Sequence, residues 1–425
     1  MPAATREEQA LAEIAATAIR PTAAWTLCAS FLVLVAVGSW IELARWRAGG
    51  ATVFSGSPEM PALQELAATW QTRGTLAANE ELRAALLALE DRMGRESALS
   101  ARLRPHAQLA LLRLLRYGNS QVIAGKPPHL YFRTAFDHLV GPPFLRPDAL
   151  QRRRHAIGPG IRFEPDPVPG LASLGEELGR RGIQLVFFPV PVKAAIHPEP
   201  LLLFGSTSKE PLQSPSLPEL IRRLRAAGVR TYDPAPEMRA RAVAGDSLYF
   251  PTDTLWNPRG MEVAARGLAR FLQTEGLLPE LPPAGLEKHP LPYAFRGDLT
   301  TLLGLGPLAD RIPQEATDLT EVTWLGRAPI ATWSGNADLL LLGDSYSVFP
   351  IDVGAPAARF GDRLAFELDR PVRRIAKVAT NDLPDRVSWL RDEPALLDGI
   401  RVVIYEVTAR AFSSTDWSAE SLEPD

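Results

Sequence analysis

A serine that follows a run of four leucines is the first residue in the chain that could support nucleophilic chemistry. Leu339 to Leu342 form a short apolar run that ends at Gly343, which predicts a buried central strand leading into a tight turn. Ser345 then lies just past the carboxyl end of the strand, where open α/β sheets place their sites. Its hydroxyl is a candidate nucleophile, provided that a base can accept its proton. The alternative is that Asp344 and Ser345 only cap the next helix, because both residue types are good N-caps.

An acidic residue stands in a loop within the second notable stretch, residues 249–262. Asp253 precedes a predicted helix that begins at Asn257 and Pro258. A carboxylate in this position can be a charge partner of the helix N-terminus. It can also be the acid that orients the base of a catalytic triad. Because Asp253 and Ser345 both follow an apolar run that ends in a turn, we expect them to meet at one end of the sheet.

Alternating strands and helices must position these residues. The apolar runs predict strands at residues 183–188, 339–342, 374–378 and 402–407. Between them, Ser216 and Glu219 have the spacing of a capping box that opens a helix, and Gly228 is its expected end. Strands that alternate with helices indicate an α/β fold with a parallel sheet covered on both faces.

The N-terminal part of the chain contains a long uncharged segment. No charged residue stands between Arg20 and Glu42, and this run would form a helix of roughly 31 Å, the thickness of a bilayer core. The alternatives are a cleaved signal peptide and a buried core helix, and the balance of basic residues does not decide the orientation. We predict a tail at 1–20, a transmembrane signal anchor at 21–43, a helical stalk or cap at 44–117, a main domain at 118–415 and a tail at 416–425.

The composition narrows the classes of partner. The chain has 425 residues, of which 46% are hydrophobic, and its net charge of -3 gives no support for a nucleic-acid partner. Cys28 is the single cysteine, so neither an intramolecular disulfide nor a cysteine-based zinc site is possible. We expect no metal.

Several blocks of the sequence, in this order and spacing, resemble the alginate O-acetyltransferase family of the AlgX/AlgJ type. Asp253-Thr254-Leu255-Trp256 before the Asn257-Pro258 helix, with Gly343-Asp344-Ser345-Tyr346-Ser347 downstream, is similar to two motifs of that family. Further similar blocks are Gly125 to Arg133, Pro189 to Lys193, Gly297 to Leu299 and Val403 to Glu406. The resemblance covers about residues 115–415. It implies an SGNH-hydrolase-like domain with a flavodoxin-like, three-layer parallel sheet in permuted order.

The resemblance also implies a mechanism, and the sequence departs from it at the base. In the family a serine attacks an acetyl donor, a histidine is the base and an aspartate orients the histidine. Carried over, Ser345 is the nucleophile and Asp253 the acid, but the base position is Leu255. None of the six histidines lies in the Asp253 loop, and only folding could bring His129 or His197 to the site. Possible supporting residues are Gly343, Asp344, Lys193, Asn381 and Trp256.

A second departure follows Ser345. Where the family has a Gly-rich turn, this chain has Thr380-Asn381-Asp382, and the Asn381 side chain would have to replace an oxyanion donor. Together the two departures favour a degenerate site for cell-envelope polysaccharide O-acetylation. The alternatives are a non-catalytic polysaccharide-binding or scaffold subunit, or an esterase with a different base. The resemblance implies a polysaccharide ligand, an acetyl donor supplied by a membrane-bound O-acyltransferase partner, no cofactor, and an inner-membrane protein with a periplasmic main domain.

Overall fold

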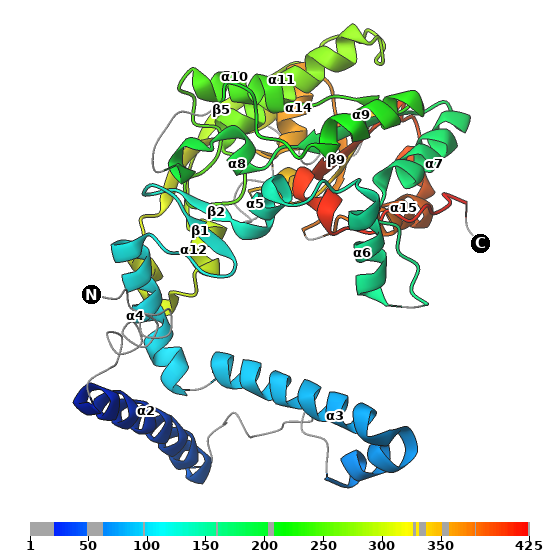
Figure 1. The fold of residues 1–425 in the computed structure, drawn as a ribbon. Coiled ribbons are helices and arrows are strands. Elements are labelled where there is room, and N and C mark those ends of the chain that lie inside the picture. The colour runs from blue at the N-terminus through cyan, green and yellow to red at the C-terminus, as the bar shows by residue number, and fades with distance from the viewer. Residues whose placement is uncertain are drawn as a thin grey trace, which may run out of the picture. The chain divides into compact units, whose positions relative to one another are not determined.

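The computed structural model of the chain divides into two compact units, Met1–Ala107 and Gln108–Asp425 (Figure 1). The structure describes residues 21–48, 63–96, 98–158, 160–202, 208–325, 329–330, 337–350, 357–378 and 380–423. The predicted tail at 1–20 lies outside these residues.

The first unit is helical, as the sequence predicts for residues 44–117. Helix α2 spans Pro21–Arg47 and α3 spans Leu63–Glu96 with a break at Gly74. Helix α4 spans Ala98–Leu115, and its part from Gln108 onward belongs to the second unit. Within the described part of the chain, no helix has both the length and the apolar character needed to cross a membrane. The predicted transmembrane anchor at 21–43 is therefore not supported, although a helix does form there.

The second unit is built on a five-stranded sheet in which every strand pair is parallel. Its order is β4 (Arg230–Thr231), β3 (Gln184–Val190), β9 (Val402–Thr408), β7 (Leu339–Gly343) and β8 (Arg373–Ala376). The predicted parallel sheet and its strands are thus confirmed. All five residues of β7 are buried, because β9 and β8 flank the strand and helices cover both faces. The central strand is β9, however, and β7 lies beside it.

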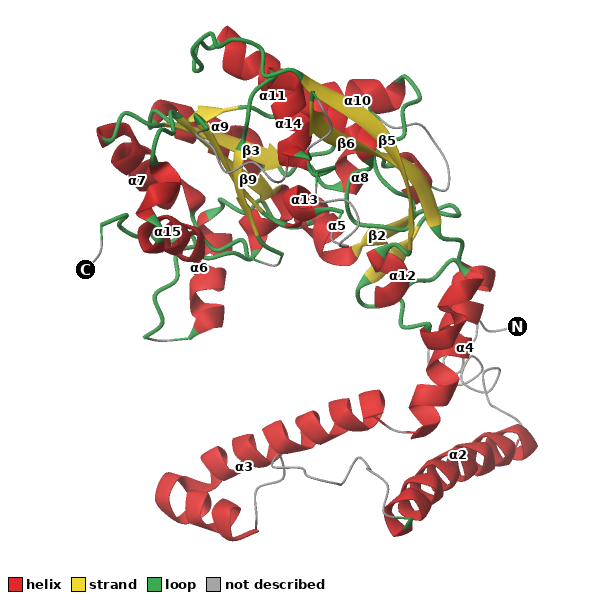
Figure 2. Cartoon of the chain, turned by 180° about the vertical axis from the view of Figure 1, so that it is seen from behind, coloured by secondary structure: helices red, strands yellow, loops and turns green. Residues whose placement is uncertain are grey.

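Side chains alternate between two hydrophobic cores along each strand. In β7, Leu339 and Leu341 join one core, and Leu340 and Leu342 join the other. Figure 2 shows the helices of both layers. The first core is covered by α8 (Lys193–Ile196), α10 (Ala235–Val243), α11 (Pro258–Thr274) and α14 (Phe360–Leu368). The second is covered by α7 (Pro167–Arg180), α9 (Ser216–Ala226) and α15 (Leu383–Asp392).

The structure confirms one of the two predicted helix-start motifs and contradicts the other. The side chain of Asn257 caps α11 by accepting the amide N–H of Gly260, at 3.0 Å, so this start is confirmed. The predicted capping box of α9 is wrong, because the Ser216 hydroxyl instead accepts the distant amide of Leu145, at 3.0 Å. The helix does end before Gly228, whose φ of +82° favours glycine.

The remaining elements lie outside the five-stranded sheet. Strands β1 (Val122–Ala124) and β2 (Leu130–Phe132) form a hairpin, and β5 (Leu286–Phe295) and β6 (Glu315–Trp324) form an antiparallel ribbon that the sequence analysis did not predict. The other helices are α5 (Arg133–Val140), α6 (Pro147–Ile157), α12 (Asp298–Leu302) and α13 (Ser345–Val348). Short 3-10 helices occur at Glu199–Leu201, Gly306–Arg311, Pro394–Leu397 and Ala409–Ser413.

The predicted C-terminal tail at 416–425 is wrong for most of its length. Trp417 is fully buried, its ring centroid is 5.8 Å from that of Phe412, and its amide donates to the carbonyl of Glu164 at 2.8 Å. Leu422 is also buried in the second core. The main domain therefore continues to at least residue 422.

Candidate active site

Ser345 is the first residue of α13, directly after β7, and it is partly exposed. Asp344 holds the turn with both carboxylate oxygens. Oδ1 accepts the amide of Tyr346 at 2.8 Å, and Oδ2 accepts the amide of Thr408, at the end of the neighbouring strand β9, at 2.8 Å. The capping interpretation is thus correct for Asp344. It does not exclude a role for the Ser345 hydroxyl, which takes no part in the cap.

A second acidic side chain supports the same turn from beneath. Glu406, in β9, is fully buried, and its Oε2 accepts the amide of Asp344 at 2.9 Å and the hydroxyl of Ser347 at 2.7 Å. Burial, with a smaller effect of the nearby Asp344 carboxylate, raises the pKa of Glu406 well above its ordinary value. This turn therefore rests on a carboxyl group that the fold favours in its neutral form.

The turn also requires glycine at position 343. A Cβ atom at Gly343 would lie 2.4 Å from Cβ of Ser347 and 2.9 Å from Oε2 of Glu406. Neither neighbour can retreat easily, because the two are hydrogen-bonded to each other. Gly343 is therefore a packing requirement of the Ser345 turn, as the sequence motif suggested.

The Asp253 loop lies beside the Ser345 turn, as the sequence predicted. The hydroxyl of Tyr346 donates to the carbonyl of Thr254 at 3.1 Å. The indole N–H of Trp256 donates to the carbonyl of Tyr346 at 3.2 Å, and the two rings meet edge to face with centroids 5.2 Å apart. These contacts join residues 90 or more positions apart in the sequence. Trp256 therefore positions the turn from the buried side.

The carboxylate of Asp253 is committed to the backbone of its own surroundings. Its Oδ1 accepts the amide of Leu255 at 2.8 Å, and its Oδ2 accepts the amide of Asp298 at 2.8 Å. The side chain is buried, and burial, with a smaller effect of Asp298, raises the pKa of Asp253 to about 7. Both oxygens thus stabilise the loop, where a triad acid would accept an imidazole N–H.

No imidazole replaces the missing base. The side chain of Leu255 is only 6% exposed and packs into the first hydrophobic core. The ring of His197 accepts the amide of Leu248 at 3.0 Å, and the ring of His129 contacts the carbonyl of Lys126 at 3.3 Å. The other four histidines also contact residues outside the site. Among the described residues, therefore, no histidine hydrogen-bonds to Ser345 or Asp253.

Lys193 holds the Asp253 loop against the β1–β2 hairpin. Its ammonium group donates to three carbonyl oxygens, those of Leu130 at 2.6 Å, Pro251 at 2.7 Å and Asp253 at 3.2 Å. Burial lowers the pKa of Lys193 to about 7, partly opposed by the Asp253 carboxylate. All three N–H donors of the charged form are used, so the geometry is that of a structural clamp.

Comparison with known proteins now identifies the domain. A model of the SGNH hydrolase-like domain of the acetyltransferase AlgX matches residues 165–409, more than half of the chain. The chain belongs to the AlgX family. The resemblance seen in the sequence motifs is therefore correct.

Individual relatives agree with this assignment. The probable alginate O-acetylase AlgJ of Pseudomonas aeruginosa is 27% identical over 246 residues, which are 55% of this chain and 60% of the relative. AlgJ of Azotobacter vinelandii is 31% identical over 142 residues, 33% of this chain and 36% of the relative. This chain thus spans less than two thirds of each relative's length. The O-acetyltransferase domain of Pseudomonas putida AlgJ has the same fold, with a TM-score of 0.53 at 21% identity, over 69% of this chain and 93% of that domain.

Two further residues lie near this AlgX-family site, and the sequence analysis named only one of them. Asn381 was singled out as a substitute oxyanion donor. Its Oδ1 is buried and has no hydrogen-bond partner among the described residues, while the neighbouring carbonyl of Thr380 accepts Nε of Arg386 at 3.3 Å. The oxyanion role of Asn381 stays a prediction. Arg386 was not singled out, yet it also donates to the carbonyls of Leu342, at 3.3 Å, and Glu406, so it supports the strand ends beneath Ser345.

Arg410 is a second residue near the site that the sequence analysis missed. It follows β9, its Nη1 donates to the Thr408 hydroxyl at 3.2 Å, and its guanidinium carbon lies 5.6 Å from the centroid of the Phe132 ring. Burial raises the pKa of Tyr346, and the positive charge of Arg410 partly opposes this effect, which places that charge near the Ser345 turn. Within the described part of the chain, Arg410 has no carboxylate partner. The sequence feature that could have identified Arg410 is its position two residues past an apolar strand.

The described residues contain no group of three or more histidine, cysteine, aspartate or glutamate side chains that could hold a metal ion. Around the Ser345 turn, the described residues place one partly exposed hydroxyl and the half-buried guanidinium group of Arg410.

Proposed function

We propose that this protein is an accessory component of cell-envelope polysaccharide O-acetylation, in which the Ser345 site binds its ligand without the activation that a triad provides. A single observation carries the proposal. The base position is occupied by Leu255, whose side chain is packed in the core, and each oxygen of the Asp253 carboxylate already accepts a backbone amide. Without a base the hydroxyl of Ser345 stays protonated and weakly nucleophilic.

The size of the expected deficit supports this proposal. Removing the histidine from a serine triad lowers kcat by about 10⁶ in well-studied proteases. Within the described part of the chain, Lys193 is not free to take the proton, because its ammonium group donates to three carbonyls. Any hydrolysis by the unmodified protein should therefore be close to that of a generic protein surface.

The ligand that we propose is an acidic polysaccharide. The relatives are named for alginate, and Arg410 offers a half-buried guanidinium group with no described carboxylate partner beside the serine. The link of Arg410 to the serine turn runs through Thr408, whose hydroxyl accepts its Nη1 at 3.2 Å and whose amide donates to Asp344 at 2.8 Å. A guanidinium group binds carboxylates well because its planar fork matches their two oxygens. The acetyl donor would be supplied by a separate membrane-bound O-acyltransferase, with this domain located outside the cytoplasm. A C-terminal alkaline phosphatase fusion tests the location, because this reporter is active only outside the cytoplasm. A fusion that the cells produce but that shows no phosphatase activity would contradict the proposed location.

An esterase with an unusual base is the second candidate. The observation in its favour is that the pKa of Lys193 is lowered to about 7, which is suitable for a general base. Against it, the lysine faces three backbone carbonyls of the Asp253 loop and the hairpin. We therefore rank this candidate below the accessory role.

Acetyl ester hydrolysis by the purified full chain distinguishes the two. The substrates are a nitrophenyl acetate and an acetylated oligouronate, and the matched variants are Ser345→Ala and Ser414→Ala, the latter a serine outside the site. We expect the same background rate for all three proteins. A rate well above background that Ser345→Ala removes and Ser414→Ala leaves unchanged would refute the accessory role and favour the esterase.

A further inference from the structure

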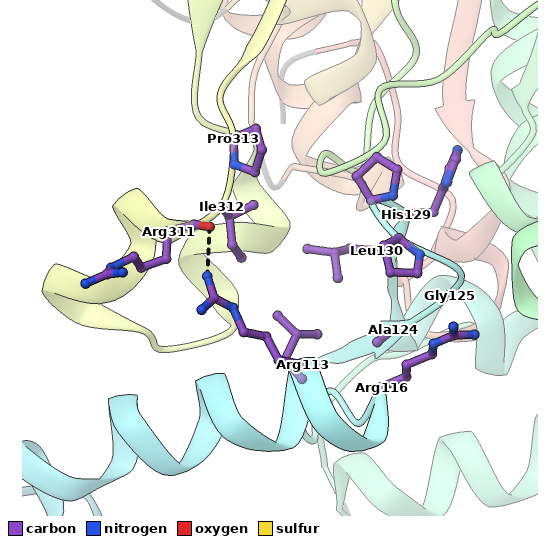
Figure 3. Close-up of a pocket in the computed structure, with 12 residues that line it drawn as sticks. Arg113, Arg116, Ala124, Gly125, His129, Leu130, Arg311, Ile312 and Pro313 are labelled. Atoms are coloured by element: carbon purple, nitrogen blue, oxygen red, sulfur yellow. Dashed lines mark hydrogen bonds between the residues drawn. The ribbon is translucent and has the colours of Figure 1, made fainter.

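A pocket of about 520 Å³ lies against the β1–β2 hairpin, apart from the Ser345 turn. Its walls come from the last turn of α4, the loop that joins the two strands, and the segment that follows the 3-10 helix Gly306–Arg311 (Figure 3). Leu112, Leu130 and Ile312 form its apolar floor, and prolines complete it. The volume is in the range of ordinary small-ligand sites.

Three arginines, Arg113, Arg116 and Arg311, line this pocket and give it a positive charge. Figure 3 shows Arg113 extending from α4 toward the backbone of Arg311, whose carbonyl accepts its Nη2 at 3.4 Å, and Arg116 beside the loop of Gly125. No aspartate or glutamate lines the pocket. Within the described part of the chain, neither Arg113 nor Arg116 forms an ion pair. The charge is thus available to an anionic ligand.

The backbone at Arg116 is an independent indication that its side chain has a use. Its φ is +51°, immediately after α4 ends at Leu115, in the left-handed conformation that favours glycine. An arginine in this conformation is strained relative to glycine, and such outliers persist where the surroundings or a function require them.

One residue connects the pocket with the Asp253 loop. The side chain of Leu130 lines the pocket, while its amide donates to the carbonyl of Pro251 at 2.8 Å. Its carbonyl accepts the ammonium of Lys193 at 2.6 Å, and the same ammonium contacts the carbonyl of Asp253 at 3.2 Å. A ligand in the pocket therefore lies one strand away from the loop that flanks Ser345.

We infer that this pocket is a second binding site, for a segment of an acidic polysaccharide. This inference rests on the proposed function for the polymer class, and on the pocket itself for the charge. Guanidinium forks of separate arginines fit carboxylates on different sugar units, and the apolar floor fits the C–H face of a sugar ring between them. A chain with repeated charges should bind much better than a single charged sugar, because several carboxylates can pair with the cations at once.

Binding to the full-length protein tests the site directly. The probes for titration calorimetry are an unacetylated tetrauronate, a neutral tetrasaccharide of the same length and a single uronate. We expect tetrauronate binding that the neutral probe and the single uronate lack. Arg116→Gly and Arg113→Gln should each weaken it about tenfold or more, whereas Arg180→Gln, an exposed arginine in the last turn of α7, should not change it.

Arg116→Gly separates loss of binding from loss of folding, because glycine suits a φ of +51° and should leave the melting temperature unchanged or higher. Unchanged tetrauronate affinity in both pocket variants, or equal affinity for the neutral probe, would overturn the inference. Affinity lost in Arg410→Gln but not in the pocket variants would also overturn it, while leaving the proposed function intact. Serine-dependent hydrolysis together with pocket-dependent binding would instead refute only the accessory role.

Discussion

Restoring the missing histidine is the sharpest test of the site, and the structure limits how much Leu255→His can achieve. The new imidazole would stand two residues after Asp253, on the loop that contacts the Ser345 turn. A triad histidine is worth about 10⁶ in rate. Its orienting acid accounts for up to about 10⁴ of that figure. Because both oxygens of Asp253 already accept backbone amides, we expect a gain of only about 10² over the unmodified protein.

The same substitution should destabilise the domain. Leu255 is 6% exposed and belongs to the first core, so replacement by a polar ring should lower the free energy of unfolding by about 1–3 kcal/mol. Burial lowers the pKa of His197 to about 4, and a buried imidazole at 255 should likewise be neutral at pH 7, as a base requires.

The assay is acetyl ester hydrolysis normalised to the folded fraction, which urea unfolding measures in parallel. Ser345→Ala in the Leu255→His background should remove the gain. A well-folded Leu255→His variant with no gain would refute the reasoning, since it would show that the site has changed beyond this residue. A gain near 10⁶ would show that the backbone amides release Asp253 readily.

Three further predictions concern stability. Glu406→Ala should cost about 2–4 kcal/mol in urea unfolding, because it leaves the amide of Asp344 and the hydroxyl of Ser347 without their acceptor. The raised pKa of Glu406 means that its stabilising contribution is complete below its ordinary pKa of 4.5 and is lost as the pH rises through the folded-state value. Glu406→Gln should therefore flatten the decline in melting temperature at high pH, and an unchanged decline would contradict this. Lys193→Met should lower the free energy of unfolding by about 3 kcal/mol or more, because three buried carbonyls lose their donor. A melting temperature within a few degrees of that of the unmodified protein would contradict this prediction. Gly343→Ala should reduce soluble, cooperatively folding protein, since its Cβ would lie 2.4 Å from Cβ of Ser347, and normal unfolding would contradict the packing argument.

The sheet was predictable because its signals are local. A fully buried parallel strand is a short, continuous apolar run, and β7 and β9 both have this pattern. The β5–β6 ribbon lacks it, since β5 is mostly exposed and contains Pro290 and Pro292, which argue against a strand. The failed capping box at Ser216 shows a different limit. Its spacing was correct, but a residue 71 positions away in the sequence bonds to the hydroxyl instead.

The site was predictable in its location and not in its bonding. The rule that sites lie at the carboxyl ends of parallel strands placed Ser345, which follows β7. Asp253 follows helix α10 and no strand of the sheet, and its loop reaches the same place through the contacts of Trp256 and Thr254 with Tyr346. The more distant partner of Asp253 could not be foreseen, because the Asp298 amide is 45 positions away in the sequence and belongs to the first residue of α12. Arg410 was overlooked for the same reason. An arginine after a strand is ordinary until the fold shows that no described carboxylate accompanies it.

These bonds change the meaning of the residues that match the family motif. The presence of Asp253 and Lys193 could be taken as a sign of an active enzyme. The reasoning would be that a site that has lost its base has no catalytic use for these two residues and need not keep them. The structure gives both a different use, because together they bind two amides and three carbonyls of the loop and hairpin. They would be needed in an inactive member as much as in an active one. The hydroxyl of Ser345 has no such bond among the described residues, so the presence of this serine is the feature that structural stability does not explain. Whether the protein has any acyl-transfer chemistry therefore depends on Ser345 alone, and the Ser345→Ala comparison is more informative than any substitution of Asp253 or Lys193.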